Sequence, residues 1–153
     1  MSSLDALDTA ILRELQADAR STNRDPAAAV GVAPTTALDR VRSLRDRGVL
    51  TGSTVTFDLA ALGRSVQAMI AVRIRPPSRK HIEGFRSWVS GLPETIGVFV
   101  TSGTEDFLVH VAVPDNDALY AFVIDRLTER PEVADVRTSV VYEHVRSAVI
   151  APL

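Results

Sequence analysis

The sequence predicts an α+β protein: an N-terminal helix-turn-helix of the winged type, followed by a sheet domain with the βαββαβ order of a ferredoxin-like fold. Two observations predict this architecture. Up to residue 50, apolar residues recur at helical spacing in three segments separated by short turns. Further along, alternating apolar and polar stretches are interleaved with two more segments of helical periodicity. We therefore expect one domain at 1–51, a linker at 52–65 and a second domain at 66–153.

The composition argues against several classes of protein. The 153 residues carry a formal net charge of −2 and include no cysteine, which argues against disulfides and thiolate metal sites and suits a reducing cytoplasm. Residues 1–20 lack the apolar segment flanked by cations that a signal peptide needs. No apolar run approaches the roughly 20 residues of a membrane-spanning helix. We expect a cytoplasmic protein with no membrane partner.

The N-terminal third predicts three helices. The first has an apolar stripe that runs through residues 4–20. A turn leads to a short alanine-rich helix, with Asp25 expected as its N-cap and Gly31 at its end. The third helix is expected to begin at Pro34, which suits a first helical turn, and to stop at Gly48. Two short helices joined by a tight turn with glycine, after a longer helix, are typical of a helix-turn-helix.

The rest of the chain alternates between strand and helix patterns. A short strand is expected at 49–57, before a hinge around Gly63. The main strands are expected at 66–74, 95–103, 107–113 and 133–143, and residues 146–150 could extend the last one. One helix follows the prolines at 76 and 77, and the other opens at Pro114. Their apolar stripes consist of Ile82, Phe85, Val89 and Leu92, and of Leu119, Phe122, Val123 and Leu127.

The strand at 66–74 also indicates a partner subunit. Its alternation puts one set of apolar residues on the face that the helices should cover, but Met69 and Ala71 stand on the other face. Both faces are therefore expected to be covered, and a second copy related by a twofold axis is the commonest cover. We expect a homodimer.

The third helix concentrates positive charge on a chain whose net charge is negative. Four arginines lie within residues 40–47, most of them away from the apolar stripe. In a helix-turn-helix, the second helix of the motif enters the major groove of DNA with its N-terminal residues nearest the bases. Threonine hydroxyls and methyls suit base recognition, and arginines suit phosphates. The residues expected to contact DNA are Pro34, Thr35, Thr36, Asp39, Arg40, Arg42, Ser43 and Arg47.

Each of these residues also has an ordinary structural interpretation. The threonines could be a polar helix start, and the arginines a solvated face that Asp39 and Asp46 balance. Arg40 could hold Asp39 or an acid of the first helix instead of a phosphate. Arg45 borders the apolar stripe, where its aliphatic stem is expected to pack.

The segment 101–106, TSGTED, joins two central strands and offers groups that could bind a ligand. Gly103 lets the backbone approach a ligand closely, because it has no Cβ and adopts positive φ at little cost. Backbone N–H groups and hydroxyls suit a ligand carboxylate, and an aspartate suits an amino group. The candidate residues are Thr101, Ser102, Gly103, Thr104 and Asp106, with Arg137, Thr138 and Ser139 on the last strand as further candidates. A plain hairpin turn explains the same composition.

Taken in order, these motifs resemble the Lrp/AsnC family, the leucine-responsive or feast/famine transcription regulators, over nearly the whole chain. The matching residues are Leu4-Asp5, Asp8, Ile11-Leu12, Leu15, Asp18, Arg20, Val30-Gly31, Pro34-Thr35, the run from Arg40 to Leu50, Gly103 and Asp106. Two positions depart from the family pattern. Ala33 stands where a serine usually caps the third helix, and Asp25-Pro26-Ala27 stands where an acidic residue, leucine and alanine are usual.

The resemblance implies an N-terminal DNA-binding domain and a C-terminal regulation-of-amino-acid-metabolism domain that dimerises and binds a small effector. It points to the 101–106 loop as part of an amino-acid site between dimers. We therefore expect a sequence-specific transcriptional regulator that binds double-stranded DNA. Its assembly or its DNA affinity is expected to change with a small effector, an amino acid. We expect a homodimer and a higher oligomer such as an octamer.

Two other classes of function fit the sequence less well. The alternative is a ligand-binding regulator that acts through a protein partner, with Phe85 and Trp88 as the candidate contact face. An enzyme is not expected, because His81, His110 and His144 lack the spacing of metal ligands. The sequence also has no nucleophile elbow and no glycine-rich phosphate loop. We therefore expect no catalytic residue, no metal site and no cofactor.

Overall fold

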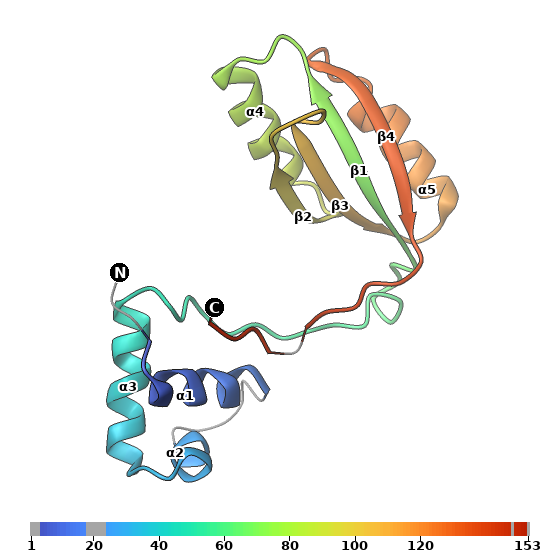
Figure 1. Cartoon of the computed structure of the whole chain (residues 1–153). Coiled ribbons are helices and arrows are strands. Elements are labelled where there is room, and N and C mark those ends of the chain that lie inside the picture. The colour runs from blue at the N-terminus through green and yellow to red at the C-terminus, as the bar shows by residue number, and fades with distance from the viewer. Residues whose placement is uncertain (1–3, 18–23, 148, 153) are drawn as a thin grey trace. The chain divides into compact units, whose positions relative to one another are not determined.

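The structure is a computed structural model of the chain, shown in Figure 1. It describes residues 4–17, 24–147 and 149–152. The chain divides into two compact units, one made of residues 1–56 with 145–153 and the other of residues 57–144. The predicted order of a helix-turn-helix followed by a βαββαβ sheet domain is confirmed.

Three helices and one apolar cluster form the first unit. The helices are α1 (Ala6–Ala17), α2 (Arg24–Val30) and α3 (Pro34–Asp46). The buried centre of the cluster consists of Ile11, Val41 and Leu44. These residues lie on the apolar stripes predicted for the first and third helices. The packing therefore confirms both stripes. The predicted end of the first helix, residues 18–20, lies outside the described residues.

Glycines end α2 and α3 as predicted. Gly31 and Gly48 have φ of +72° and +71°, in the left-handed region that glycine adopts at little cost. The N–H of the residue after Gly48 donates to a carbonyl of the last turn of α3 at 2.9 Å, which closes the helix. At the start of α2, Arg24 is already helical, so the prediction of Asp25 as the N-cap is wrong.

The predicted strands at 49–57 and 146–150 are wrong. Residues 51–57 have no regular structure and are exposed, with Val55 and Phe57 at 73% and 66%. The described residues of the second segment have no strand either. Alternation alone does not make a strand, because the backbone N–H and C=O groups must pair with a neighbouring strand. The described part of this unit provides no such neighbour.

Four antiparallel strands in the order β2-β3-β1-β4 form the sheet of the second unit. The strands are β1 (Val66–Ile74), β2 (Thr95–Val100), β3 (Phe107–Val113) and β4 (Val133–Val141). The helices are α4 (Arg79–Ser90) and α5 (Asn116–Ala121), the latter continued by the π-helical segment η1 (Phe122–Leu127). The four main strands and both helices are therefore confirmed, and β1 and β3 begin and end at the predicted residues.

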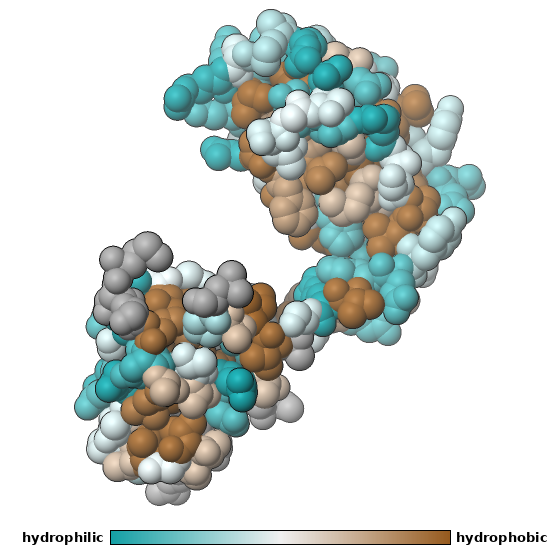
Figure 2. Space-filling model, viewed as in Figure 1, coloured by the Kyte–Doolittle hydropathy of each residue, from teal (hydrophilic) through white to brown (hydrophobic). Residues whose placement is uncertain are grey.

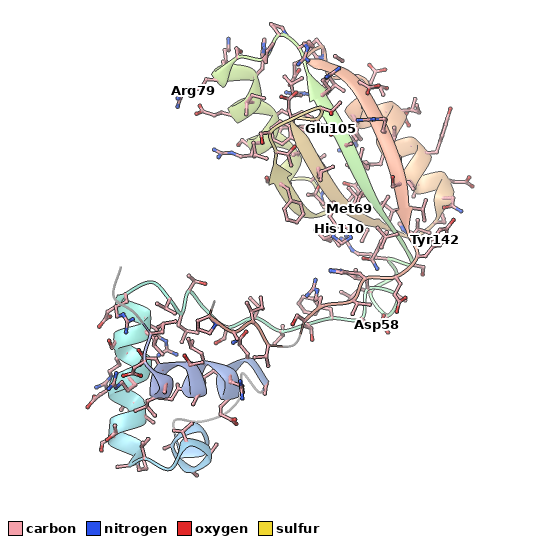
Figure 3. The ribbon with its side chains drawn as sticks, in the orientation of Figure 1. Asp58, Met69, Arg79, Glu105, His110 and Tyr142 are labelled. Atoms are coloured by element: carbon pink, nitrogen blue, oxygen red, sulfur yellow. The ribbon has the colours of Figure 1, made fainter. Side chains whose placement is uncertain are left out.

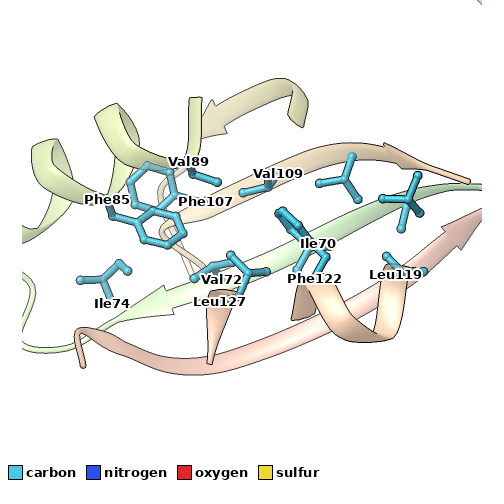
Figure 4. Close-up of a cluster of buried hydrophobic side chains, with 13 residues drawn as sticks. Ile70, Val72, Ile74, Phe85, Val89, Phe107, Val109, Leu119, Phe122 and Leu127 are labelled. Atoms are coloured by element: carbon cyan, nitrogen blue, oxygen red, sulfur yellow. The ribbon is translucent and has the colours of Figure 1, made fainter. Parts of the chain in front are cut away.

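One face of this sheet packs against the helices, as Figure 4 shows. Alternate residues of β1 and β3 point to this face and are buried. On the helix side, the Phe85 ring of α4 lies 4.8 Å from the Phe107 ring, centroid to centroid. Burial of these apolar side chains is the main stabilising term of the unit, at about 25 cal/mol per Å² removed from water.

Candidate DNA interface and effector loop

The N-terminal turn of α3 presents the predicted base-reading residues to solvent. Thr35 and Thr36 are exposed, as is Pro34 at the first helical position. Ala33 is the N-cap, and its side chain makes no hydrogen bond to the helix. The sequence prediction that α3 lacks a capping side chain at this position is confirmed. Its first backbone N–H groups therefore receive no acceptor from residue 33.

Arg42 lies on the exposed side of α3. Its Nη1 is 3.8 Å from Asp39 Oδ1, in a pair whose side chains are 65% and 76% exposed. A pair this exposed adds little stability and does not prevent the arginine from binding another anion. Arg45 is exposed as well, and Ser43 is half-buried.

Arg40 and Arg47 form ion pairs with Asp5, which precedes α1, and with Asp8, which lies on α1. Arg40 Nη1 lies 2.8 Å from Asp5 Oδ2 and 3.3 Å from Asp8 Oδ1. Arg47 Nη1 lies 3.1 Å from Asp8 Oδ2. Of the two ion pairs predicted as alternatives for Arg40, the one with an acid of the first helical segment is confirmed. The ion pair of Arg47 was not predicted.

Asp8 is the residue that the sequence analysis missed. Its side chain is almost fully buried, and a buried carboxylate must be paired with positive charge to be tolerated. A signal was present in the sequence, because Asp8 stands between Leu7 and Ile11 on the apolar stripe of α1. An acid on a buried stripe predicts a basic partner on a neighbouring helix.

Asp5 caps α1. Its Oδ1 accepts the backbone N–H of Asp8 at 2.7 Å, in the geometry of an N-cap residue. This N–H lowers the pKa of Asp5 below its ordinary value, desolvation opposes the shift, and Arg40 supports it. The carboxylate is therefore ionised at neutral pH, as its ion pair with Arg40 requires.

The 101–106 loop is held by hydrogen bonds at its base, and its tip is exposed to solvent. Asp106 holds the base, since its Oδ2 accepts the Ile74 N–H of β1 at 2.7 Å. The Thr101 N–H donates to the Asp106 carbonyl at 2.9 Å, and the Thr101 hydroxyl donates to another carbonyl of the loop. The exposed tip consists of Ser102, Gly103 and Thr104. Gly103 has φ of +121°, so the predicted need for glycine at this turn is confirmed.

The last strand brings Arg137, rather than Thr138, to this loop. Thr138 pairs with Ile70 in the register of β4 and β1, so its side chain points to the face that the helices cover. Arg137 pairs with Ala71 on the other face and forms an ion pair with Glu105. Glu105, labelled in Figure 3, was not a predicted site residue. Within one subunit, the loop and Thr138 do not form one site.

The sheet face opposite the helices has no described helix of the sheet unit packed on it, and most of its side chains are half-buried or exposed. Met69 of β1 and His110 of β3 stand side by side on it (Figure 3). His110 Nε2 lies 3.2 Å from Gln67 Oε1. Phe99 of β2 is 56% exposed on the same face, and other apolar side chains are exposed on both units (Figure 2). The expectation that this face needs a second subunit stays a prediction.

Of the two residues of the proposed partner face, Phe85 is not at the surface and Trp88 is half-buried. Phe85 is fully buried among the sheet and helices. Trp88 lies beneath the guanidinium of Arg130, whose carbon is 4.6 Å from the ring centroid. The two aromatic rings therefore serve the packing of the sheet unit.

The described residues contain no group of three or more His, Cys, Asp or Glu side chains that could hold a metal ion. His81 Nδ1 lies 3.0 Å from the Pro76 carbonyl oxygen. The His144 ring lies 5.8 Å from that of His110. Among the described helices, none combines the length and the apolar character needed to span a bilayer.

The chain is similar to known transcriptional regulators along nearly its whole length. Residues 4–45 match the AsnC-type helix-turn-helix domain, and residues 67–149 match the Lrp/AsnC ligand binding domain. The HTH-type transcriptional regulator AldR of Mycolicibacterium smegmatis is 39% identical, over 95% of this chain and 85% of its own length. The leucine-responsive regulatory protein of Rhizobium meliloti is 34% identical, over 95% of this chain and 93% of its own.

Solved structures are similar as well. A transcriptional regulator from Neisseria meningitidis, in complex with L-Met, has a TM-score of 0.89 at 29% identity, covering 98% of this chain and 97% of its own. AsnC of E. coli has a TM-score of 0.85 at 25% identity, covering 99% of this chain and 100% of its own. Both share the two-part architecture described above.

Proposed function

The chain belongs to the Lrp/AsnC family of transcriptional regulators, and on this premise we propose that it binds specific sites on double-stranded DNA through α3 and responds to an amino acid. The observation that carries the DNA part is the exposed polar edge of α3, on which Thr35, Thr36 and Arg42 stand clear of the apolar core. Such a protein acts in the cytoplasm and needs no catalytic reaction of its own.

In this proposal the first turn of α3 lies in the major groove. Thr35 and Thr36 contact base edges, and Arg42 contacts a phosphate. The remaining residues of the DNA-facing edge are Pro34, Asp39, Arg40, Ser43 and Arg47. One helix offers few phosphate contacts, so two copies that bind half-sites about one helical turn apart would supply useful affinity.

Arg42→Ala tests the DNA contact. We expect it to weaken binding to every duplex alike and to reduce the slope of log K against log salt by about 0.9 for each bound helix. Arg47→Ala is a poorer test, because it would also deprive the buried Asp8 carboxylate of a partner. Fluorescence anisotropy with a duplex selected from random sequence, over a salt series, measures both affinity and slope.

Arg79→Ala is the matched control, since Arg79 is 89% exposed on α4 of the other unit and pairs with Glu83 (Figure 3). It changes the net charge by the same amount but is expected to leave affinity and slope close to those of the wild type. Equal losses in the two variants would mean that overall charge, rather than α3, drives binding.

For the effector, we propose that the exposed tip of the 101–106 loop receives the carboxylate of an amino acid. Its support is the set of donors at the tip, which the base of the loop does not use: the Ser102 hydroxyl and the backbone N–H groups of Gly103 and Thr104. Two similar proteins carry amino acids in their names, a leucine-responsive regulator and an L-Met complex. These names describe those proteins and motivate the choice of ligands here.

Isothermal titration of the full chain with each of the standard amino acids tests the effector proposal. Ser102→Ala is expected to weaken binding of the amino acid that the wild type prefers. Ser87→Ala, at an exposed serine of α4, serves as the control and should leave that affinity unchanged. Lack of heat with every amino acid, or equal losses in both variants, would contradict this site.

We also propose that a second copy covers the open sheet face, and that dimers assemble further. The support is the row of half-buried or exposed apolar side chains there, from Met69 and Ala71 to Phe99. Met69→Lys is expected to yield monomers in sedimentation velocity. Tyr120→Lys, at a side chain that is 69% exposed on α5, is the control and should sediment as the wild type does. A Met69→Lys chain of unchanged mass would place the interface elsewhere.

A further inference from the structure

One buried carboxylate contacts two arginines that lie about two helical turns apart. Asp8 on α1 is 1% exposed, and each of its oxygens faces one guanidinium. Arg40 Nη1 is 3.3 Å from Oδ1, and Arg47 Nη1 is 3.1 Å from Oδ2. The two arginines are seven residues apart, which places them about two turns apart along one edge of the helix. Asp8 therefore anchors the edge of α3 that is proposed to face DNA.

The two arginines are held in place but not buried. Their side chains remain 40% and 26% exposed. Each guanidinium therefore reaches the surface while its Nη1 contacts the buried Asp8 carboxylate. Arg42 differs, because the carboxylate beside it is 76% exposed and 3.8 Å away. A partly buried opposite charge near 3 Å offsets the attraction of a guanidinium for a phosphate far more than a solvated one does.

We propose that Asp8 is a positioning residue of the DNA interface, which fixes Arg40 and Arg47 and offsets their charge, and so restrains binding that does not depend on sequence. The inference rests on the proposed function. Attraction between cations and phosphates supplies nearly all non-specific binding, whereas base contacts supply discrimination. An internal acid that offsets phosphate-binding cations therefore lowers the affinity for every duplex and reduces its dependence on salt.

Asp8→Asn tests the inference, because asparagine has the size of aspartate without its charge. Binding of the full chain is measured by fluorescence anisotropy, over a salt series, to a duplex selected from random sequence and to a scrambled duplex of equal length. Each additional phosphate contact made by these arginines steepens the slope of log K against log salt by about 0.9. This adds a roughly three- to fourfold loss of affinity between about 50 and 200 mM salt.

We therefore expect Asp8→Asn to bind both duplexes more tightly at low salt, and its affinity for each to fall more steeply with salt than that of the wild type. Glu14→Gln is the matched control. Glu14 lies on the same helix and has no ion pair among the described residues, so the same change of charge should leave the slope unchanged.

Asp5→Asn provides a second, milder variant. Asp5 is half exposed and pairs with Arg40, and asparagine can still cap α1. We expect a steeper slope than that of the wild type, by less than in Asp8→Asn. If Asp8→Asn fails to fold, as judged by circular dichroism, an unchanged slope in the folded Asp5→Asn chain overturns the inference.

A purely structural Asp8 would lower affinity for both duplexes without steepening the slope. That result, or a slope equal to that of Glu14→Gln, overturns the inference in a folded Asp8→Asn chain. The proposed function survives such an outcome as long as Arg42→Ala still weakens binding. A wild-type chain that binds no duplex overturns both.

Discussion

Ala33→Ser is expected to stabilise the helix-turn-helix unit by about 1 kcal/mol. Ala33 has the extended backbone of an N-cap, with φ of −65° and ψ of 145°, and its carbonyl already accepts the Ala37 N–H at 3.1 Å. A serine hydroxyl there would accept the N–H of Thr35 or Thr36, which receives no acceptor from the alanine. Residue 33 is exposed, so the added oxygen is not buried.

The expected magnitude follows from measured caps. Replacing a serine cap by alanine costs about 0.5–2 kcal/mol, and the reverse change should return a similar free energy. For a unit of this size, 1 kcal/mol corresponds to a shift of roughly 4–8 °C in the unfolding midpoint. Trp88 is the single tryptophan and lies in the sheet unit. Circular dichroism follows the helices of both units, while tryptophan fluorescence follows the sheet unit alone.

We therefore expect Ala33→Ser to raise the transition of the helix-turn-helix unit seen by circular dichroism, and to leave the fluorescence transition unchanged. Ala28→Ser makes the same chemical change at an exposed position inside α2. Because serine forms helices less readily than alanine, this control should lose about 0.5 kcal/mol. The capping argument is refuted if both serines shift the transition in the same direction, or if Ala33→Ser moves only the fluorescence transition.

Three further changes test the core, the C-terminal segment and the response to acid. Phe85→Ala should cost the sheet unit about 3–5 kcal/mol, because the ring is fully buried; a urea midpoint near that of the wild type, followed by tryptophan fluorescence, would contradict this. Gln16→Ala removes two hydrogen bonds to the backbone of Ile150, at 2.8 and 3.1 Å, so amide exchange at Ile150 should accelerate, and an unchanged rate would argue against this contact. The lowered pKa of Asp5 means that its carboxylate stabilises the fold above about pH 4, and that this contribution is lost as the pH falls through the lowered pKa. The midpoints of the wild type and Asp5→Asn should therefore converge in acid, and a gap independent of pH would disprove the assignment.

The sheet could be predicted closely because its signals are local. The strands at 66–74 and 107–113 carry an apolar residue at every second position, and Pro76 and Pro114 follow soon after their ends. Proline lacks the N–H that a central strand needs, so it bounds such a strand in the sequence itself. The segment at 49–57 has similar alternation, but whether it becomes a strand depends on a neighbour that the pattern cannot supply.

The site was harder to predict because it depends on contacts between segments far apart in the chain. The exposed threonines of α3 follow from its helical period, which any sequence window shows. The ion pairs of Arg40 and Arg47 instead require α1 to dock on α3, which brings Asp8 within reach from more than thirty residues away. The sequence offered an acid of the first helix as one of two alternative partners for Arg40, and it indicated no partner for Arg47.

The face on which Thr138 lies could not be predicted for a related reason. Neighbouring residues of a strand point to opposite faces, so a pairing register that differs by one residue exchanges Thr138 for Arg137 at the loop. The alternation of β4 does not determine which set faces the helices, because most of its residues are exposed in the chain. Only the pairing with the clearly alternating β1 settles the matter.

Exposed apolar residues on the open sheet face bear on stability as well as on assembly. Phe99 is 56% exposed, although a phenylalanine gains about 1.5–3 kcal/mol from full burial. If a second copy covers this face, the free energy of unfolding of the sheet unit must depend on protein concentration. A roughly hundredfold dilution would then lower it by about 2.7 kcal/mol for each dimer, and the fluorescence transition of Trp88 would shift with it. A midpoint that stays constant over that dilution would mean that the sheet unit owes its stability to the helix-covered face alone.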